Sequence, residues 1–144
     1  MSLAEEAERL SRRRARMMPF LAIILVCQQG AFAVAEQSPR RSVDYISTGA
    51  WLLLAAVILA ALVTGGFWAK PRPVRDLMDD DVTKANRAQA LALGFVLSIV
   101  TAMVLYIVDF VETVSAGIAI HLIVTFGLAG AMLRFSLLER RALG

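Results

Sequence analysis

The sequence predicts an all-α integral membrane protein with four transmembrane helices. We expect them as two antiparallel hairpins, preceded by a short amphipathic N-terminal helix on the cytoplasmic side. The 144 residues are 58% hydrophobic and 19% charged, whereas soluble domains are usually about 45–50% apolar and about 25% charged. The apolar residues gather in a few long uncharged runs, a pattern typical of membrane spans.

The longest apolar stretch, Ala88–Leu133, carries only two formally charged side chains, Asp109 and Glu112. These carboxylates divide it into two uncharged runs, 88–108 and 113–133, each of which we interpret as a membrane span. At 1.5 Å per residue, a helix of about 20 residues crosses the ~30 Å hydrocarbon core of a bilayer. We therefore expect a transmembrane hairpin with a tight external turn at the two carboxylates.

The first half of the chain repeats this pattern less compactly. The predicted first span begins at Met17, and Pro19 lies in its first turn, where a missing backbone N–H does little harm. A polar loop with Pro39 separates it from the second span. The predicted order is a basic helix, first span, external loop, second span, cytoplasmic loop, third span, external turn, fourth span and cytoplasmic tail, at residues 1–16, 17–35, 36–44, 45–69, 70–87, 88–108, 109–112, 113–134 and 135–144.

The distribution of positive charge orients the predicted spans. Thirteen of the fifteen Lys and Arg residues lie towards the two termini or in the 70–87 loop, while Arg40 and Arg41 alone lie in the 36–44 loop. The positive-inside rule then places both termini in the cytoplasm, in a bacterial-type inner membrane. The basic N-terminal helix fits an orientation signal that contacts anionic headgroups. The alternative is a docking helix for a cytoplasmic protein.

Small residues recur every four positions along three of the predicted spans. Such rows let helix backbones approach closely, which favours association in lipid. We therefore predict helix packing through these rows and expect His121 to point into the bundle. The rows are Ala90, Gly94, Ser98 and Ala102 on the third span; Thr113, Gly117, His121, Thr125 and Ala129 on the fourth; and Ala56–Ala60 and Ala61–Gly65 on the second.

A group of polar side chains is predicted in the outer half of the bundle. His121, the single histidine, has a depth similar to that of Gln28 and Thr101, and Tyr106 lies above Thr101. A glutamine amide in lipid requires a partner, so we expect Gln28 to face other helices. An ionisable residue inside a membrane is a candidate functional residue. Two interpretations stay open: a neutral His121 that locks the bundle through Gln28 or Thr101, or a polar lining for a ligand path.

The external carboxylates Asp109 and Glu112 stand three residues apart and can share a face. We predict that Arg40 or Arg41 pairs with them and ties the two helix pairs together outside the membrane. The alternatives are two solvated carboxylates at headgroup level, or a mouth that collects cations above His121.

The sequence offers little support for a metal, haem or catalytic site. The single cysteine, Cys27, excludes an internal disulfide and a CxxC motif. The acidic run Asp79–Asp81 lacks the calcium-loop spacing and is better interpreted as a helix cap. One histidine argues against haem, and no serine nucleophile stands beside His121, so we expect no enzyme. A quinone held by His121, Tyr106 and Gln28, or a bound lipid, stays an open alternative.

Three functions are compatible with these patterns, and none involves a nucleic acid, because the cations are tied to helix ends. The preferred one is a non-catalytic accessory subunit or homo-oligomeric component of a larger membrane assembly, since packing rows are abundant and chemical groups are scarce. The second is a small oligomeric transporter or channel with a polar path around His121. The third is a regulatory membrane protein that binds a cytoplasmic partner through residues 1–16 and 76–87.

Overall fold

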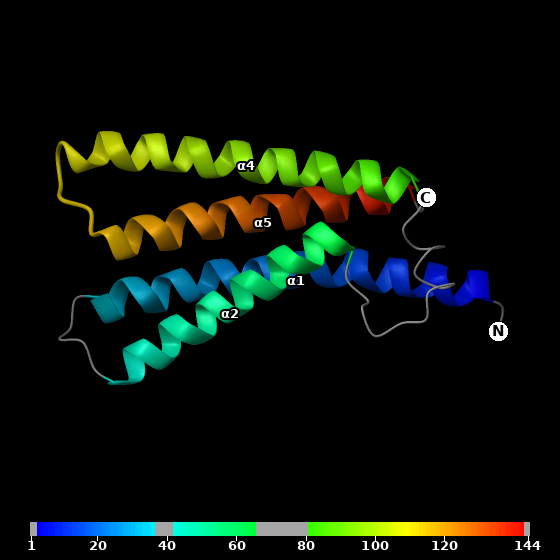
Figure 1. The fold of residues 1–144 in the computed structure, drawn as a ribbon, viewed down its shortest axis with the longest axis horizontal. Helices are drawn as coiled ribbons and strands as arrows, with labels where there is room; N and C mark the ends of the chain where they lie inside the picture. The colour runs from blue at the N-terminus through cyan, green and yellow to red at the C-terminus, as the bar shows by residue number, and fades with distance from the viewer. Residues whose placement is uncertain (1–2, 37–41, 66–80, 143–144) are drawn as a thin grey trace.

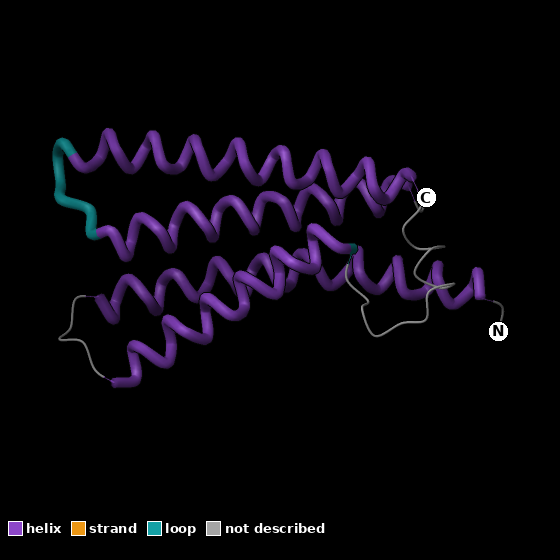
Figure 2. The backbone as a smooth tube through the Cα atoms, viewed as in Figure 1, coloured by secondary structure: helices purple, strands orange, loops and turns teal. Residues whose placement is uncertain are grey.

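The chain is all-helical in the computed structural model, which describes residues 3–36, 42–65 and 81–142 (Figure 1). In these ranges the tube in Figure 2 shows helices and loops and no strand. The helices are α1 (Leu3–Glu36), α2 (Ser42–Thr64), α4 (Asp81–Asp109) and α5 (Ala116–Ala142). Three of them, α2 over Tyr45–Thr64, α4 and α5, are long and apolar enough to cross a membrane. The predicted all-α class is confirmed, whereas the predicted first span, at 17–35 in α1, is not among these three and stays a prediction.

α1 joins the predicted basic helix and the predicted first span into one continuous helix. Pro19 therefore lies well inside α1 and not near its start. An internal proline removes the N–H that would bond the carbonyl four residues earlier. That carbonyl belongs to Ala15, and it accepts a hydrogen bond of 2.6 Å from Ser136 Oγ of α5. The neighbouring helix thus supplies the donor that the proline lacks.

α5 is the central helix of the structure. It packs along α4 and along α1, whereas α2 approaches α5 and α4 closely over a shorter stretch (Figure 1). α4 and α5 form the predicted antiparallel hairpin. α1 and α2 also run in opposite directions, but the main partner of α1 is α5. The first two helices are therefore not packed as a second hairpin, because α1 turns its buried stripe towards α5.

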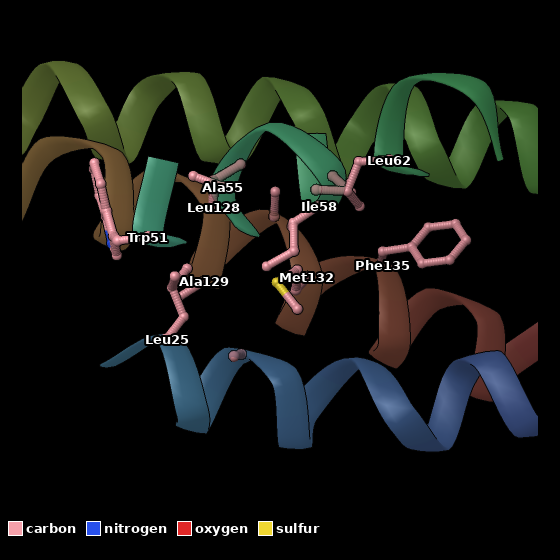
Figure 3. Close-up of a cluster of buried hydrophobic side chains, with 12 residues drawn as sticks. Leu25, Trp51, Ala55, Ile58, Leu62, Leu128, Ala129, Met132 and Phe135 are labelled. Carbon is pink, nitrogen blue, oxygen red and sulfur yellow. The ribbon is translucent and has the colours of Figure 1, made fainter. Parts of the chain in front are cut away.

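Apolar side chains fill the space between α5, α1 and α2 (Figure 3). Met132 of α5 and Leu25 of α1 are fully buried, and Ile58 of α2 is nearly so. Buried positions on α5 alternate in steps of four and three residues, the spacing of helices that pack along their length. They include His121, Thr125, Leu128, Met132, Phe135 and Glu139.

The backbones of α4 and α5 come closest at two glycines. A Cβ atom on Gly94 would lie 2.7 Å from the carbonyl oxygen of Gly127 and 2.9 Å from Cβ of Ala131. A Cβ on Gly127 would collide with Ser98 Oγ. Ala90 and Gly94 are buried and Ser98 is half-buried, so these three positions lie at the α4–α5 contact, and their role in stabilising it stays a prediction.

The remaining predicted packing positions are less enclosed. Ala102 and Gly117 are half-buried. On α2, Ala56 is exposed and Ala60 is half-buried, because the buried stripe of this helix runs through Trp51, Ala55, Ile58 and Leu62. Ala56 does not pack inside the described chain, and its packing role stays a prediction for contacts with another chain.

Polar side chains set the helix ends around the hairpin connection. α4 ends at Asp109, whose Oδ1 accepts a hydrogen bond of 2.9 Å from the backbone N–H of Val114. α5 begins only at Ala116, where Ser115 Oγ accepts one of 3.2 Å from the N–H of Ile118, as helix-capping serines do. The connection, residues 110–115, is therefore longer than the predicted turn at 109–112.

The start of α4 and the end of α5 both lie outside the predicted spans. α4 begins at Asp81, and a carboxylate in the first turn is favourable because the N-terminus of a helix carries a partial positive charge. α5 continues to Ala142, so most of the predicted tail at 135–144 is helical, and Glu139 within it is buried.

Substitution of Gly94 by alanine will destabilise the α4–α5 pair, because the added methyl group meets backbone and Ala131. We expect a loss of about 1–3 kcal/mol in the free energy of unfolding, measured by denaturant titration in detergent micelles. Gly49→Ala is the matched control, since a Cβ at Gly49 meets nothing within 4 Å. This control should leave stability unchanged or raise it by about 0.5–1 kcal/mol. Equal effects of the two substitutions would contradict the close approach.

Substitution of Ser136 by alanine will leave the Ala15 carbonyl without its donor. Because this acceptor is buried, we expect a loss of about 1–3 kcal/mol. Pro19→Ala restores a backbone N–H to the same carbonyl, so Ser136→Ala should be much less harmful in the Pro19→Ala background. A double-mutant cycle on unfolding free energies measures this coupling. Additive effects would show that Ser136 does not compensate for the proline.

Candidate functional site

His121 lies between two aromatic rings in the half of the bundle near the 110–115 connection. The ring of Phe32 from α1 is stacked on it at 3.6 Å between centroids, and the ring of Trp51 from α2 at 3.8 Å. The histidine is 5% exposed. It points into the bundle, as predicted, and joins α5 to both α1 and α2. Both faces of the imidazole are covered, so a ligand would have to approach its edge.

Gln29, and not Gln28, is the glutamine that faces another helix. Gln28 is exposed, whereas Gln29 is half-buried and its Nε2 donates a hydrogen bond of 2.6 Å to Thr125 Oγ1 of α5. The expectation that Gln28 turns inward is therefore wrong. The buried stripe of α1 passes through Leu25, Gln29 and Phe32, and Gln28 lies roughly 65° from the centre of this stripe around the helix.

The other residues of the predicted polar group differ in their exposure. Thr101 is half-buried on α4. Tyr106 is 69% exposed and packs edge-on against Phe110. Because Tyr106 and Gln28 both face outward, the structure gives no support to the alternative of a quinone held jointly by His121, Tyr106 and Gln28.

The two external carboxylates also have different surroundings from those expected. Asp109 and Glu112 are both exposed, and Asp109 accepts the Val114 N–H described above. Arg40 and Arg41 lie outside the described residues, so their predicted pairing with these carboxylates stays a prediction.

A buried ion pair, not anticipated from the sequence, connects three helices at the opposite end of the bundle. Arg14 Nη2 of α1 lies 2.9 Å from Glu139 Oε2 of α5, and the side chains are 6% and 4% exposed. Asn86 Nδ2 of α4 donates to Glu139 Oε1 at 3.3 Å. Arg14 Nη1 donates to the carbonyl oxygen of Gly65, directly after α2, at 3.0 Å. The guanidinium also lies over the ring of Phe135, 4.9 Å from its centroid.

The stability of this cluster depends on how many hydrogen bonds its two charged groups make. Two charges removed from water require close contact and satisfied hydrogen bonds, and breaking such a pair is strongly destabilising. Here the carboxylate is bonded through both oxygens and the guanidinium through two of its nitrogens. The cluster therefore fixes the relative positions of α1, α4, α5 and the end of α2.

The sequence contains a signal for this pair. On α5, the row of buried positions through His121 and Met132 reaches Glu139 in steps of three and four residues. On α1, a similar row of buried positions runs back from Leu25, and Arg14 lies beside it. The prediction assigned Arg14 to the orientation signal and Glu139 to a tail, because both lie outside the apolar runs.

Few groups in the described residues have the chemistry for metal binding. No cluster of three or more His, Cys, Asp or Glu side chains occurs among them. Cys27 is exposed, and Asp81 pairs with Lys84 at 3.4 Å. Asp79 and Asp80 lie outside the described residues.

Comparison of the whole chain with protein-family models, curated proteins and solved structures finds no match.

Removal of either member of the buried pair will destabilise the bundle. Arg14→Gln or Glu139→Gln leaves the partner charge buried without its counterion, and we expect a loss of about 3–5 kcal/mol in the free energy of unfolding. The matched control is Arg12→Gln, because Arg12 pairs with Glu8 at 2.7 Å in a pair whose side chains are about half exposed. Exposed pairs contribute about 0–1 kcal/mol. A control loss as large as that of Arg14→Gln would show that charge near the terminus, and not the buried contact, stabilises the protein.

Proposed function

We propose that this chain is a four-span inner-membrane protein with cytoplasmic termini that serves as a non-catalytic component of a membrane assembly, either as a homo-oligomer or as an accessory subunit. The observation that carries the proposal is the use of its inward polar groups. Arg14, Gln29, Asn86 and Ser136 each bond a neighbouring helix. Polar side chains that hydrogen-bond other helices of the same chain are occupied, so they favour a role in helix packing over a role in ligand binding or catalysis.

The outward surfaces support a membrane setting. In α4, only 6% of the most apolar window is buried inside the chain, although the helix is long enough to span a bilayer. Its outward side chains include Phe95, Val96, Met103 and Ile107. In water this face would be a large exposed apolar patch, whereas in a membrane it meets lipid or another transmembrane helix.

The proposed orientation rests on charge and on the direction of the helices. The first described residue of α1 and the last of α5 lie at the same end of the bundle, opposite the 110–115 connection (Figure 1). Near that end lie Arg9, Arg12, Arg13 and Arg16 of α1, Lys84 and Arg87 of α4, and Arg140 and Arg141 of α5, which supports a cytoplasmic location by the positive-inside rule.

The transport alternative is less well supported, because the aromatic rings on both sides of His121 leave little room for a water-filled path. The regulatory alternative has one favourable observation: Arg9, Arg12, Arg13 and Arg16 are exposed on α1. These side chains could contact an acidic cytoplasmic protein, and they could equally contact anionic headgroups.

Cysteine labelling tests the proposed topology. In a Cys27→Ser background, Val111→Cys and Arg140→Cys place single thiols on the connection and near the end of α5, both at exposed positions. A membrane-impermeant maleimide added to spheroplasts should label Val111→Cys and spare Arg140→Cys until the cells are lysed. Labelling of Arg140→Cys in intact spheroplasts would contradict the orientation, and release of the protein by alkaline carbonate would contradict membrane insertion.

Native mass spectrometry in mild detergent tests the assembly role. We expect either a defined oligomer or a copurifying membrane partner. If the exposed small face of α2 forms the contact, Ala56→Leu should weaken the association, whereas Ala92→Leu, at an exposed position on α4, should not. A strictly monomeric particle with no copurifying protein would contradict the proposal.

A further inference from the structure

An open cleft of about 310 Å³ lies between α1 and the C-terminal end of α2. Its volume is at the lower end of the range for small-molecule sites. Most of its surface is apolar, with arginine at one side. The lining includes Arg13, Met17, Met18, Leu21, Ala61 and Gly65.

Small residues on α2 leave this space open. Ala61 and Gly65 are four residues apart and face longer side chains of α1 across the cleft. Gly65 has a φ of 83°, a left-handed conformation that suits glycine, and it follows the last residue of α2. Its carbonyl accepts the Arg14 hydrogen bond, so the ion-pair cluster also fixes this wall.

Adjacent arginines have different roles at the cleft. Arg14 is 7% exposed and is directed towards Glu139 and Gly65. Arg13 is exposed and makes no ion pair with a described residue, although it lines the same cleft. A positive charge with access to solvent therefore stands at the rim of an apolar hollow.

The cleft also lies at the boundary between the charged and the apolar parts of α1. Arg13 belongs to the arginine cluster, while Met17 and Leu21 belong to the uncharged run that follows it. From Arg13 to Leu21 the helix rises about 12 Å. In a membrane-inserted chain this places the arginine at headgroup level and the apolar wall beside the acyl chains.

We infer that this cleft binds one anionic phospholipid, with its phosphate on Arg13 and an acyl chain against Met17, Leu21 and Ala61. Guanidinium groups bind phosphate through two parallel hydrogen bonds, and the apolar wall excludes a ligand that is charged throughout. The inference rests on the membrane insertion proposed above, and it is independent of the oligomeric role.

The test measures lipid retention by native mass spectrometry after extraction from vesicles of phosphatidylcholine with or without phosphatidylglycerol. We expect one phosphatidylglycerol per chain to be retained in preference to phosphatidylcholine. Arg13→Gln should lower this retention about tenfold, the equivalent of one charge-assisted contact. Arg12→Gln is the control, because Arg12 is adjacent and equally basic but does not line the cleft. Ala61→Phe keeps every charge and fills the hollow, so it should also lower retention.

Several outcomes would overturn the inference. Equal losses with Arg12→Gln and Arg13→Gln would show only general attraction of lipid to a basic surface. Unchanged retention in Ala61→Phe, with the native helical content and melting temperature, would show that no acyl chain enters the cleft. Inorganic phosphate that stabilises the protein as well as phosphatidylglycerol does would assign the site to the free anion. A chain released by carbonate would refute membrane insertion itself, whereas a membrane-bound chain without lipid preference refutes the lipid site alone.

Discussion

The buried pair of Arg14 and Glu139 determines how the helices meet at the end that holds both termini. Two charges in a poorly polarisable interior are tolerated only when their other hydrogen-bonding groups are also satisfied. Asn86 and the Gly65 carbonyl supply two such hydrogen bonds, and they come from α4 and from the residue after α2. One carboxylate and one guanidinium thus fix the relative positions of four helices. The cleft beside Gly65 is a consequence, because the same contact holds one of its walls.

Away from this cluster, the structure depends on how closely backbones approach. In lipid, apolar side chains gain little from meeting one another, so helices associate through dispersion contacts and hydrogen bonds. Gly94 and Gly127 bring α4 and α5 together, and the Ser98 hydroxyl bonds the Ile123 carbonyl across this contact at 3.3 Å. The Ser136 bond to Ala15 has the same character, since it satisfies a carbonyl that Pro19 leaves free. The inward-facing polar side chains therefore hold the helices together, and this observation is the basis of the proposed packing function.

The sequence was sufficient to predict the all-α class, the α4–α5 hairpin and the row of small residues that contains Gly94, but not that the basic helix and the first span form one helix, α1. Uncharged length and four-residue spacing of small side chains depend only on local composition and helix geometry. The inward glutamine was assigned one residue too early, because a four-residue step exceeds one helical turn and rotates the row by about 40° each time. Steps of four residues, as from Ile24 to Gln28 and Phe32, therefore follow the buried face of α1 less well than the alternating steps through Leu25, Gln29 and Phe32. The stacked rings around His121 could not be predicted, since they require the relative rotation of three helices.

The role of Arg14 shows why composition alone cannot separate a structural charge from a surface charge. Arg12, Arg13, Arg14 and Arg16 are identical side chains in one basic segment, yet Arg14 alone among them is buried. What distinguishes it is helical phase, which the packing of Ala22 and Leu25 further along α1 fixes. One residue inserted between Arg14 and Ala22 would rotate the arginine by about 100° relative to that stripe and leave the basic composition unchanged. The packed part of α1 therefore selects which arginine meets Glu139 and which arginines remain exposed, so bundle packing determines the charge on the surface of the same helix.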